Sequence, residues 1–342
     1  MKTIWKVVII LIAAGLIFST LGMSLGASRW IYWDKHGAHI VDKSEEKRIT
    51  RLDLEQIKNI DINAKFSDVE FIKSDKYGID IRYYDEDVTW DLSDGNLKIR
   101  FNVQAGNRYY NNRFFDVNLS FDYPQNYIKV YLPADIRLGT VSVQTDSGHI
   151  KIGGFRAAEV QINNSFGNLD IYSITCDKLQ IKLDSGEFSG KVLYVSGDIV
   201  HKNKFGSSRF ETIDAKNFRL DSDSGDVTLS GCRVESIDIR NDFGSITTNN
   251  LVSLKTDIDA NSAEINISGE FSGRTNINNN FGSIRFTTAK AKEDYTYDIY
   301  TDFGYVTFDN NRLNGGARGG NSSVNSLYIT NSSGDIQVYF AG

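Results

Sequence analysis

Apolar and polar residues alternate along the chain from about residue 136 onward, on both sides of a recurring Ser-Gly or Phe-Gly pair. Successive pairs are separated by 19, 19, 20, 19, 19, 19, 19, 22 and 30 residues, with Ala263 in place of one glycine. Recurrence at a fixed period is the sequence signature of a repeat architecture. The glycines of these pairs are Gly148, Gly167, Gly186, Gly206, Gly225, Gly244, Gly282, Gly304 and Gly334.

Two columns of apolar residues accompany the pairs. Two residues after the glycine the side chain is apolar except at Ser208, and five residues before it the exception is His201. Alternation of this kind predicts β-strands with one buried face. Each unit therefore predicts a strand, a tight corner at the glycine, a second strand and a short polar return. One buried column is predicted to contain Ile239, Ile258 and Ile277.

A single unit of this kind cannot bury its own apolar face, whereas stacked units share one core. The near-constant unit length favours an all-β, single-stranded β-solenoid (a β-helix) of about ten 19-residue coils. The alternative is a set of β-hairpins in a sandwich or propeller, but hairpin loops need not be equal in length. Glycine can adopt a positive φ, so the nine glycines are predicted to be structural corner residues. The residue before each of them alternates, almost regularly, between serine and phenylalanine.

The same template occurs earlier in the chain. Residues Lys65–Phe71 copy Asn280–Phe286, with Ile60 and Ile62 at the expected apolar positions. The solenoid is therefore predicted to begin near residue 58, and residues 72–134 to form an irregular, tyrosine-rich first portion. Within that portion Val88, Trp90, Gly95, Leu97 and Ile99 also fit the template, although Ser93–Asn96 could equally be an ordinary hairpin turn.

An apolar segment precedes these repeats. Residues 7–28 carry no charge, and as a helix they are long enough to cross a hydrocarbon core of ~30 Å. A cleaved signal peptide is the alternative. A cut after Ala27 puts Leu25 at the third position before the cut, where a small residue is expected, although a cut after Gly26 is conceivable. Trp30, Tyr32 and Trp33 follow directly and suit an aromatic anchor at the outer interface.

The predicted organisation is a signal-anchor transmembrane helix at 1–28 and a juxtamembrane linker at 29–50. An irregular N-terminal β region with the first coils follows at 51–135, and the regular solenoid repeats occupy 136–342. A short N-terminal tail before a long soluble segment is typical of a single-pass protein of the cell membrane whose C-terminal domain is extracellular.

Composition narrows the function classes. Hydrophobic residues make up 40% of the chain, which is enough for a substantial core. The net charge of -6 and the lack of a basic stripe argue against nucleic acid as a partner. Cys176 and Cys232 are predicted to lie three coils apart, about 14 Å at the ~4.8 Å strand spacing. This separation is too long for a disulfide, so they are predicted to be structural thiols.

Three segments of the chain resemble a known protein family. The segments Tyr127–Pro133 and Val141–Gly148 are similar to the beginning of the bacterial "putative adhesin" β-strand-repeat family, and Asn325–Ile336 is similar to its end. The resemblance covers most of residues 50–342. It implies a surface-exposed β-solenoid, frequent in Gram-positive bacteria. The family pattern has Ser-Gly-Asp at most corners, whereas half of the corners here are Phe-Gly, which weighs against a corner-based binding role shared with the family.

The outward-facing columns are where a catalytic or metal site of a solenoid would lie. Solenoid lyases and hydrolases need paired carboxylates or a basic residue on adjacent coils, and no such acid pair stands out here. Residues 221–226 resemble part of a calcium loop, but the same positions are corners in every repeat, which favours a turn. No enzyme activity, cofactor, catalytic residue or metal ligand is therefore predicted. The four histidines lack the spacing of metal ligands and are His36, His39, His149 and His201.

Charged residues on the outward face form a candidate contact surface. In a parallel coil these columns stack at ~4.8 Å, so opposite charges meet between coils. The candidate outer contact face comprises Arg219, Asp221, Asp238, Arg240, Asp257 and Asp259. The leading hypothesis is a non-catalytic cell-surface protein, an adhesin or envelope-binding module, with a wall glycan or surface protein as partner. The alternatives are a membrane-anchored envelope scaffold or stress-sensing accessory protein, and a polysaccharide-active β-helix enzyme.

Overall fold

The computed structural model describes residues 46–84, 87–102, 126–321 and 324–340, single residues Gly15 and Phe18, and the backbones of three short strands. These strands are β1 (Trp30–Asp34), β2 (Gly37–Ile40) and β8 (Phe115–Asn118). The chain divides into two compact units, and the first contains residues 1–48, 82–87 and 102–125. In this unit β1 pairs antiparallel with both β2 and β8.

The predicted anchor at 1–28 lies outside the described residues except for Gly15 and Phe18. Among the described residues no helix combines the length and the apolar character that crossing a membrane requires. The segment 29–50, predicted to be a linker, contains β1 and β2 and the start of β3 (Lys47–Leu54).

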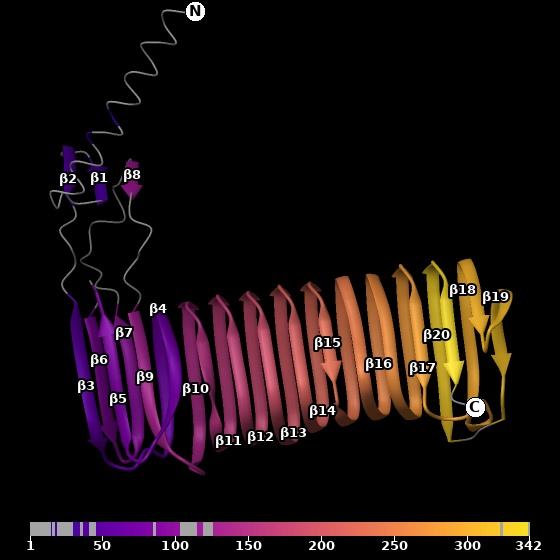
Figure 1. Cartoon of the computed structure of the whole chain (residues 1–342), viewed down its shortest axis with the longest axis horizontal. Helices are drawn as coiled ribbons and strands as arrows, with labels where there is room; N and C mark the ends of the chain where they lie inside the picture. The colour runs from indigo at the N-terminus through magenta and orange to yellow at the C-terminus, as the bar shows by residue number, and fades with distance from the viewer. Residues whose placement is uncertain are drawn as a thin grey trace, which may run out of the picture. The chain divides into compact units, whose positions relative to one another are not determined.

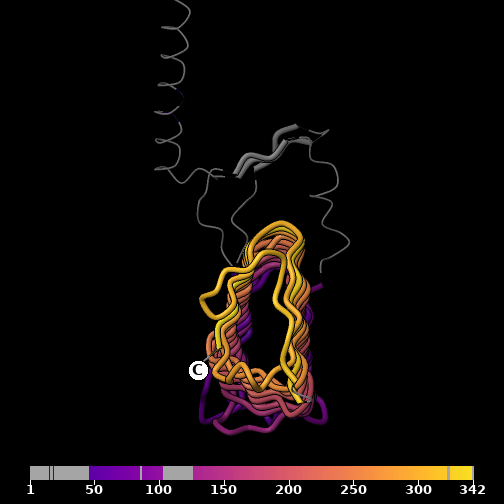
Figure 2. The backbone as a smooth tube through the Cα atoms, turned by 90° about the vertical axis from the view of Figure 1, so that its right-hand side faces the viewer, coloured from indigo at the N-terminus to yellow at the C-terminus, as the bar shows by residue number. Residues whose placement is uncertain are grey.

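The second unit, residues 49–81, 88–101 and 126–342, is a stack of parallel coils. Its strands β10 (Arg137–Ser147), β11 (Ile150–Phe166), β12 (Leu169–Ser185), β13 (Phe188–Phe205) and β14 (Ser208–Ser224) pair in parallel, each with the next. Val141 pairs with Val160, which pairs with Leu179, so neighbouring coils are offset by one sequence unit. Hairpins would have paired antiparallel, so the coil interpretation is correct for these repeats. Along the axis, the coils superimpose as a flattened ring (Figure 2).

The regular stack continues through β15 (Val227–Ser230), β16 (Arg233–Phe281) and β17 (Ile284–Thr288). Figure 1 shows these strands side by side along the stack, and the apolar columns that the alternation predicts are buried in its interior. Ile239, Ile258 and Ile277 are each 0% exposed, as expected for one buried column. The hydrophobic core therefore runs along the whole stack.

The N-terminal end of the stack does not follow chain order. Strand β4 (Asn59–Ser74) lies between later segments: β10 pairs with it on one side, while β7 (Asn96–Asn102) and β9 (Asn126–Pro133) pair with it on the other. All three pairings are parallel, and Ser147 is in register with Phe66. The copy of the repeat in β4 is therefore a true coil.

Three further strands complete this end of the stack. β5 (Tyr77–Tyr83) pairs with β3 and β9, and β6 (Asp87–Ser93) precedes β7. Asp94 and Gly95 between β6 and β7 both have positive φ, at 54° and 80°. These angles suit a tight hairpin turn, and Leu97 still pairs in coil register with Ile60. The segment thus contains a hairpin turn at Asp94 and Gly95 and a strand in coil register from Asn96 onward.

The C-terminal end also departs from chain order. Strand β20 (Asn325–Ser333) lies between β16 and β18 (Tyr295–Phe308), and β21 (Ile336–Phe340) lies between β17 and β18. After β17 and the short 3-10 helix η1 (Lys292–Asp294), the chain leaves the position of one coil empty and forms β18 in the position beyond it. The chain then turns back antiparallel as β19 (Asn311–Gly319). Strands β20 and β21 occupy the empty position. The coil of Gly334 is therefore inserted between those of Gly282 and Gly304.

The repeat between Gly186 and Gly206 is 20 residues long instead of 19. Its extra residue does not lie where the sequence predicts it. Because His201 interrupts an apolar column in this longer repeat, the sequence predicts a local bulge there, but the register shifts between Val195 and Asp198 instead. His201 itself pairs in register with Ile181 and Leu220. The extra residue lies at an exposed bend between two strand segments, where it costs no core packing.

Candidate functional site

The predicted corner glycines form one row along the stack. Most of them donate their N–H to the neighbouring coil, for example Gly167 to the carbonyl of Ser185 and Gly186 to that of Phe205. A Cβ on Gly225 would lie 2.1 Å from the carbonyl oxygen of Gly206, so a side chain does not fit between the coils. Eight of the nine glycines have positive φ, as the sequence predicted, and Gly304 is the exception.

Inside five of the corners lies a buried asparagine that the sequence analysis did not identify. The Asn164 side chain donates to the carbonyls of Gly148 and Gly167, at 3.0 and 3.2 Å, and Asn203 makes the equivalent bonds to Gly186 and Gly206. These amides satisfy corner carbonyls that the strand ladder leaves free. An asparagine recurring three residues before the glycine is the signal that could have revealed them. The other three are Asn241, Asn279 and Asn331.

Outside the corner, phenylalanine and serine alternate without exception in space. Along the chain the alternation breaks once, where the corner of Phe281 is followed by that of Phe303. Ser333 is in register with both, so the inserted coil places a serine between the two phenylalanines. At the other end Phe66 precedes Ser147. We call this row the Phe–Ser edge. In spatial order it consists of Phe66, Ser147, Phe166, Ser185, Phe205, Ser224, Phe243, Ser262, Phe281, Ser333 and Phe303.

The phenylalanines of the Phe–Ser edge face solvent. Their exposed fractions range from 54% for Phe243 to 78% for Phe303, although buried phenylalanines are plentiful elsewhere in the core. The serines between them are half-buried. The backbone follows the same alternation, since φ is 121–125° at Gly167, Gly206 and Gly244 after phenylalanine and 148–153° at Gly148, Gly186 and Gly225 after serine. Large exposed apolar residues at regular spacing are typical of a binding surface.

Carboxylates border the Phe–Ser edge on both sides. The positions two before and one after the corner residue carry ten acids against two lysines, Lys65 and Lys204. Several of these acids have structural roles: Asp68, Asp226 and Asp335 accept backbone N–H groups of the next coil at 2.7 to 3.0 Å. Lys204 pairs with Asp184 at 2.8 Å, and this hydrogen bond lowers the pKa of Asp184.

The charged residues of the candidate outer contact face contact one another and neighbouring side chains of the solenoid. Asp238 lies 4.0 Å from Arg219 on the preceding coil and 3.9 Å from Arg240 on its own strand. Asp221 contacts Lys202 at 3.7 Å and Arg219 at 3.5 Å. A binding role for this face stays a prediction.

The last two residues of that face have partners of their own. Asp257 pairs with Lys255 at 3.0 Å, and Asp259 accepts a hydrogen bond from Asn278 at 2.8 Å. Three of these contacts join neighbouring coils and therefore favour the observed register: Lys202–Asp221, Arg219–Asp238 and Asn278–Asp259.

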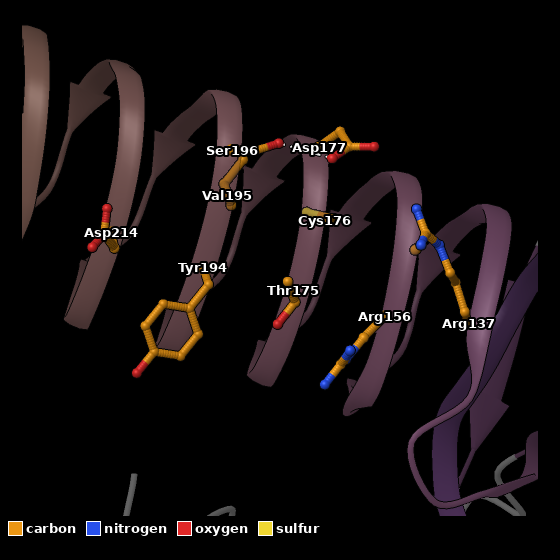
Figure 3. Close-up of a pocket in the computed structure, with 10 residues that line it drawn as sticks. Arg137, Arg156, Thr175, Cys176, Asp177, Tyr194, Val195, Ser196 and Asp214 are labelled. Atoms are coloured by element: carbon orange, nitrogen blue, oxygen red, sulfur yellow. Dashed lines mark hydrogen bonds between the residues drawn. The ribbon is translucent and has the colours of Figure 1, made fainter.

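A shallow pocket of about 350 Å³ lies elsewhere on the solenoid surface (Figure 3). Its floor contains Cys176, and Tyr194 stands at its side. Burial raises the pKa of Cys176 to about 12, so the thiol is a poor nucleophile at neutral pH. Asp177 accepts a hydrogen bond from Ser196 at 2.8 Å. The pocket thus offers no activated nucleophile.

The two cysteines and His201 are buried in the interior of the solenoid. Cys176 and Cys232 are both free and buried. His201 is fully buried against Phe188 and Phe210, with ring centroids at 4.5 and 5.4 Å, and burial lowers its pKa to about 3. Within the part of the chain that the structure describes, no group of three or more histidines, cysteines or acids could hold a metal ion.

Three solved structures are similar to the chain over most of its length. A protein described as a putative adhesin from Bacteroides fragilis is 14% identical, covers 85% of this chain and 97% of its own, and has a TM-score of 0.37. A putative cell adhesion protein from Clostridium sporogenes is 10% identical over 87% of this chain and 100% of its own, with a TM-score of 0.22. A putative lipid binding protein from Parabacteroides distasonis is 12% identical over 86% and 96%, with a TM-score of 0.32.

No curated protein matches the chain. The family model described as Toastrack DUF4097 matches it twice, over residues 57–191 and 191–339, which together span nearly the whole second unit. The match agrees with the stacked parallel coils and with the adhesin-type β-repeat resemblance of the sequence. The chain therefore belongs to the Toastrack DUF4097 family of β-repeat proteins.

Proposed function

We propose that this chain is a non-catalytic cell-surface protein whose solenoid presents one long, rigid edge to an extended partner. The observation that carries the proposal is the unbroken alternation of exposed phenylalanine and half-buried serine along the Phe–Ser edge. Burying an exposed phenylalanine would be favourable, and a row of them retained on the surface is best explained by a partner that covers it.

The continuous strand ladder makes this edge stiff. Most of the corner glycines donate a hydrogen bond to the neighbouring coil, and buried asparagines add further bonds at several corners. A partner would thus meet a surface that is already ordered, which lowers the entropic cost of binding.

Surface exposure is part of the same proposal. The uncharged segment 7–28 would anchor the chain in the cell membrane, with the solenoid on the outer side. Proteolysis of intact cells, after wall removal, is expected to digest the solenoid while cytosolic marker proteins survive. Full protection of the solenoid under these conditions would contradict export.

The binding role is tested by photo-crosslinking in cells with the full-length chain. A benzophenone amino acid is placed at Phe205 on the edge, and at Arg209 as the control, which is exposed but lies away from the edge. Crosslinked material is expected from Phe205 and not from Arg209. Equal crosslinking at both positions, or none at Phe205, would overturn the assignment of the Phe–Ser edge as the binding surface.

A further inference from the structure

We propose that the Phe–Ser edge binds a single unbranched β-1,4-linked polysaccharide that lies along the solenoid axis and is neutral or carries amino sugars. The inference rests on the proposed function, because it names the partner of the same edge. Three observations carry it: the spacing of the rings, their separation by serine, and the sign of the surrounding charge.

The spacing of the phenylalanines matches an extended β-1,4-linked chain. Neighbouring coils are ~4.8 Å apart, so phenylalanines on alternate coils recur about every 9.6 Å. In a β-1,4-linked polysaccharide each sugar is rotated by half a turn relative to the one before, so the same sugar face recurs at every second residue. One sugar advances the chain by close to one strand spacing. From Phe66 to Phe303 the edge extends over roughly 48 Å, so several disaccharide units could meet rings in register.

The chemistry of the edge also suits sugars. A phenyl ring has a negative face, which attracts the weakly positive C–H groups on the flat face of a pyranose. A half-buried serine separates each pair of rings, as Ser224 does between Phe205 and Phe243. The serine leaves room for the intervening sugar and provides a hydroxyl that can donate to it or accept from it.

The charge beside the edge selects among linear polymers. Ten acids against two lysines on the flanking positions repel nucleic acid, anionic lipid surfaces and polyanionic glycans. Asp146, Asp223, Asp242, Glu187 and Glu264 are all exposed. Carboxylates accept hydrogen bonds from sugar hydroxyls and attract the ammonium groups of unacetylated amino sugars.

Two other occupants fit less well. A second copy of this chain would bring two acidic edges together, and their like charges would repel. An extended peptide presents side chains on one face about every 6.8 Å, a period that does not match the rings at about 9.6 Å.

The test uses the purified full-length chain and three polysaccharides: chitin, chitosan and cellulose, with polygalacturonate as the polyanionic comparison. Sedimentation with the insoluble polymers and calorimetry with chito-oligosaccharides are expected to show binding that strengthens as the oligosaccharide becomes long enough to span a second ring. The variants Phe205→Ala and Phe243→Ala are expected to lose affinity about tenfold each, the effect of one stacked ring. Leu254→Ala, exposed but outside the edge, is the matched control and should bind normally.

Ser224→Phe tests the period itself. It fills the space between two rings, so a polymer that reads the two-coil repeat should bind more weakly, whereas a partner attracted by apolar area alone should bind more strongly. Stronger binding of this variant would overturn the inference, as would unchanged binding after loss of both phenylalanines or equal binding of polygalacturonate. Binding of a lysine-rich peptide without any binding of the three polysaccharides would also overturn it. If polysaccharide binding is absent while Phe205 still crosslinks in cells, the glycan assignment fails and the proposed binding function remains.

Discussion

The Nε2 atom of His201 lies 2.8 Å from the hydroxyl of Ser208 in the interior of the solenoid. These are the two residues that break the apolar columns of the sequence, one before and one after the same corner. Because the two side chains are hydrogen-bonded to each other, the two breaks in the apolar columns have one structural cause. Asn203 also donates to this hydroxyl at 3.3 Å, so the polar groups form one buried cluster inside the Gly206 corner.

This pairing predicts a strong coupling between the two positions. Ser208→Val should cost about 1–3 kcal/mol of unfolding free energy, because it leaves a buried imidazole nitrogen without a partner. His201→Leu combined with Ser208→Val should recover most of that loss, since both polar groups are then removed. Denaturant unfolding of the single and double variants measures the coupling. Losses that simply add would show that the hydrogen bond contributes nothing.

The buried imidazole also predicts a specific pH dependence. Burial lowers the pKa of His201 from 6.5 to about 3, so the unfolded chain takes up a proton below pH 6.5 while the folded chain does not. The stability contributed by the neutral ring is therefore fully present above pH 6.5 and is lost as the pH falls toward 3, by up to ~1.4 kcal/mol per pH unit. Replacing this ring with leucine should flatten the acid limb of a stability profile. His149→Gln, at a partly exposed histidine 3.1 Å from Asp170, is the control for removing a histidine, and the acid limb that His201 causes should persist in this variant.

Truncation in the central apolar column should be costly. Ile258 is fully buried, and Ile258→Ala is expected to lower the unfolding free energy by about 2–5 kcal/mol because it leaves a cavity. Thermal or urea unfolding provides the measurement. An unchanged midpoint would mean that the register of the coils is incorrect.

The corner glycines should tolerate no side chain. At Gly225, with φ of 153°, an added methyl group would meet the Gly206 carbonyl oxygen at 2.1 Å, so Gly225→Ala should destabilise by roughly 1–3 kcal/mol or more. Gly154 has φ of 75° but open space around its Cβ position. Gly154→Ala therefore isolates the conformational cost, about 1–2 kcal/mol. Equal losses in the two variants would show that close packing of the coils is irrelevant.

Charge reversal separates a structural role of the outer contact face from a binding role. Arg240 is more than half exposed and lies 3.9 Å from Asp238, so Arg240→Glu should cost less than about 1 kcal/mol and leave cell-surface attachment unchanged. Attachment of cells producing this variant is compared with that of Arg209→Glu, an exposed position outside the face. A loss of attachment with normal stability, seen only for Arg240→Glu, would identify the face as a contact surface.

The sequence by itself determined the coil, its length and its buried columns. These features are local, because alternation and corner glycines act within one unit and its immediate neighbours, and Ile239, Ile258 and Ile277 lie where the pattern placed them. It also displayed the serine–phenylalanine alternation, but not whether those rings were buried.

Only the tertiary structure decided the order of the coils at the two ends. A parallel strand pair gains the same backbone hydrogen bonds whichever part of the chain supplies the strand, so local pattern cannot tell a neighbour in sequence from one in space. The Gly334 coil thus lies between those of Gly282 and Gly304, and β4 lies between β9 and β10. That order extends the Phe–Ser edge without a break to Phe66 at one end and to Ser333 and Phe303 at the other, because distant segments are brought into one register.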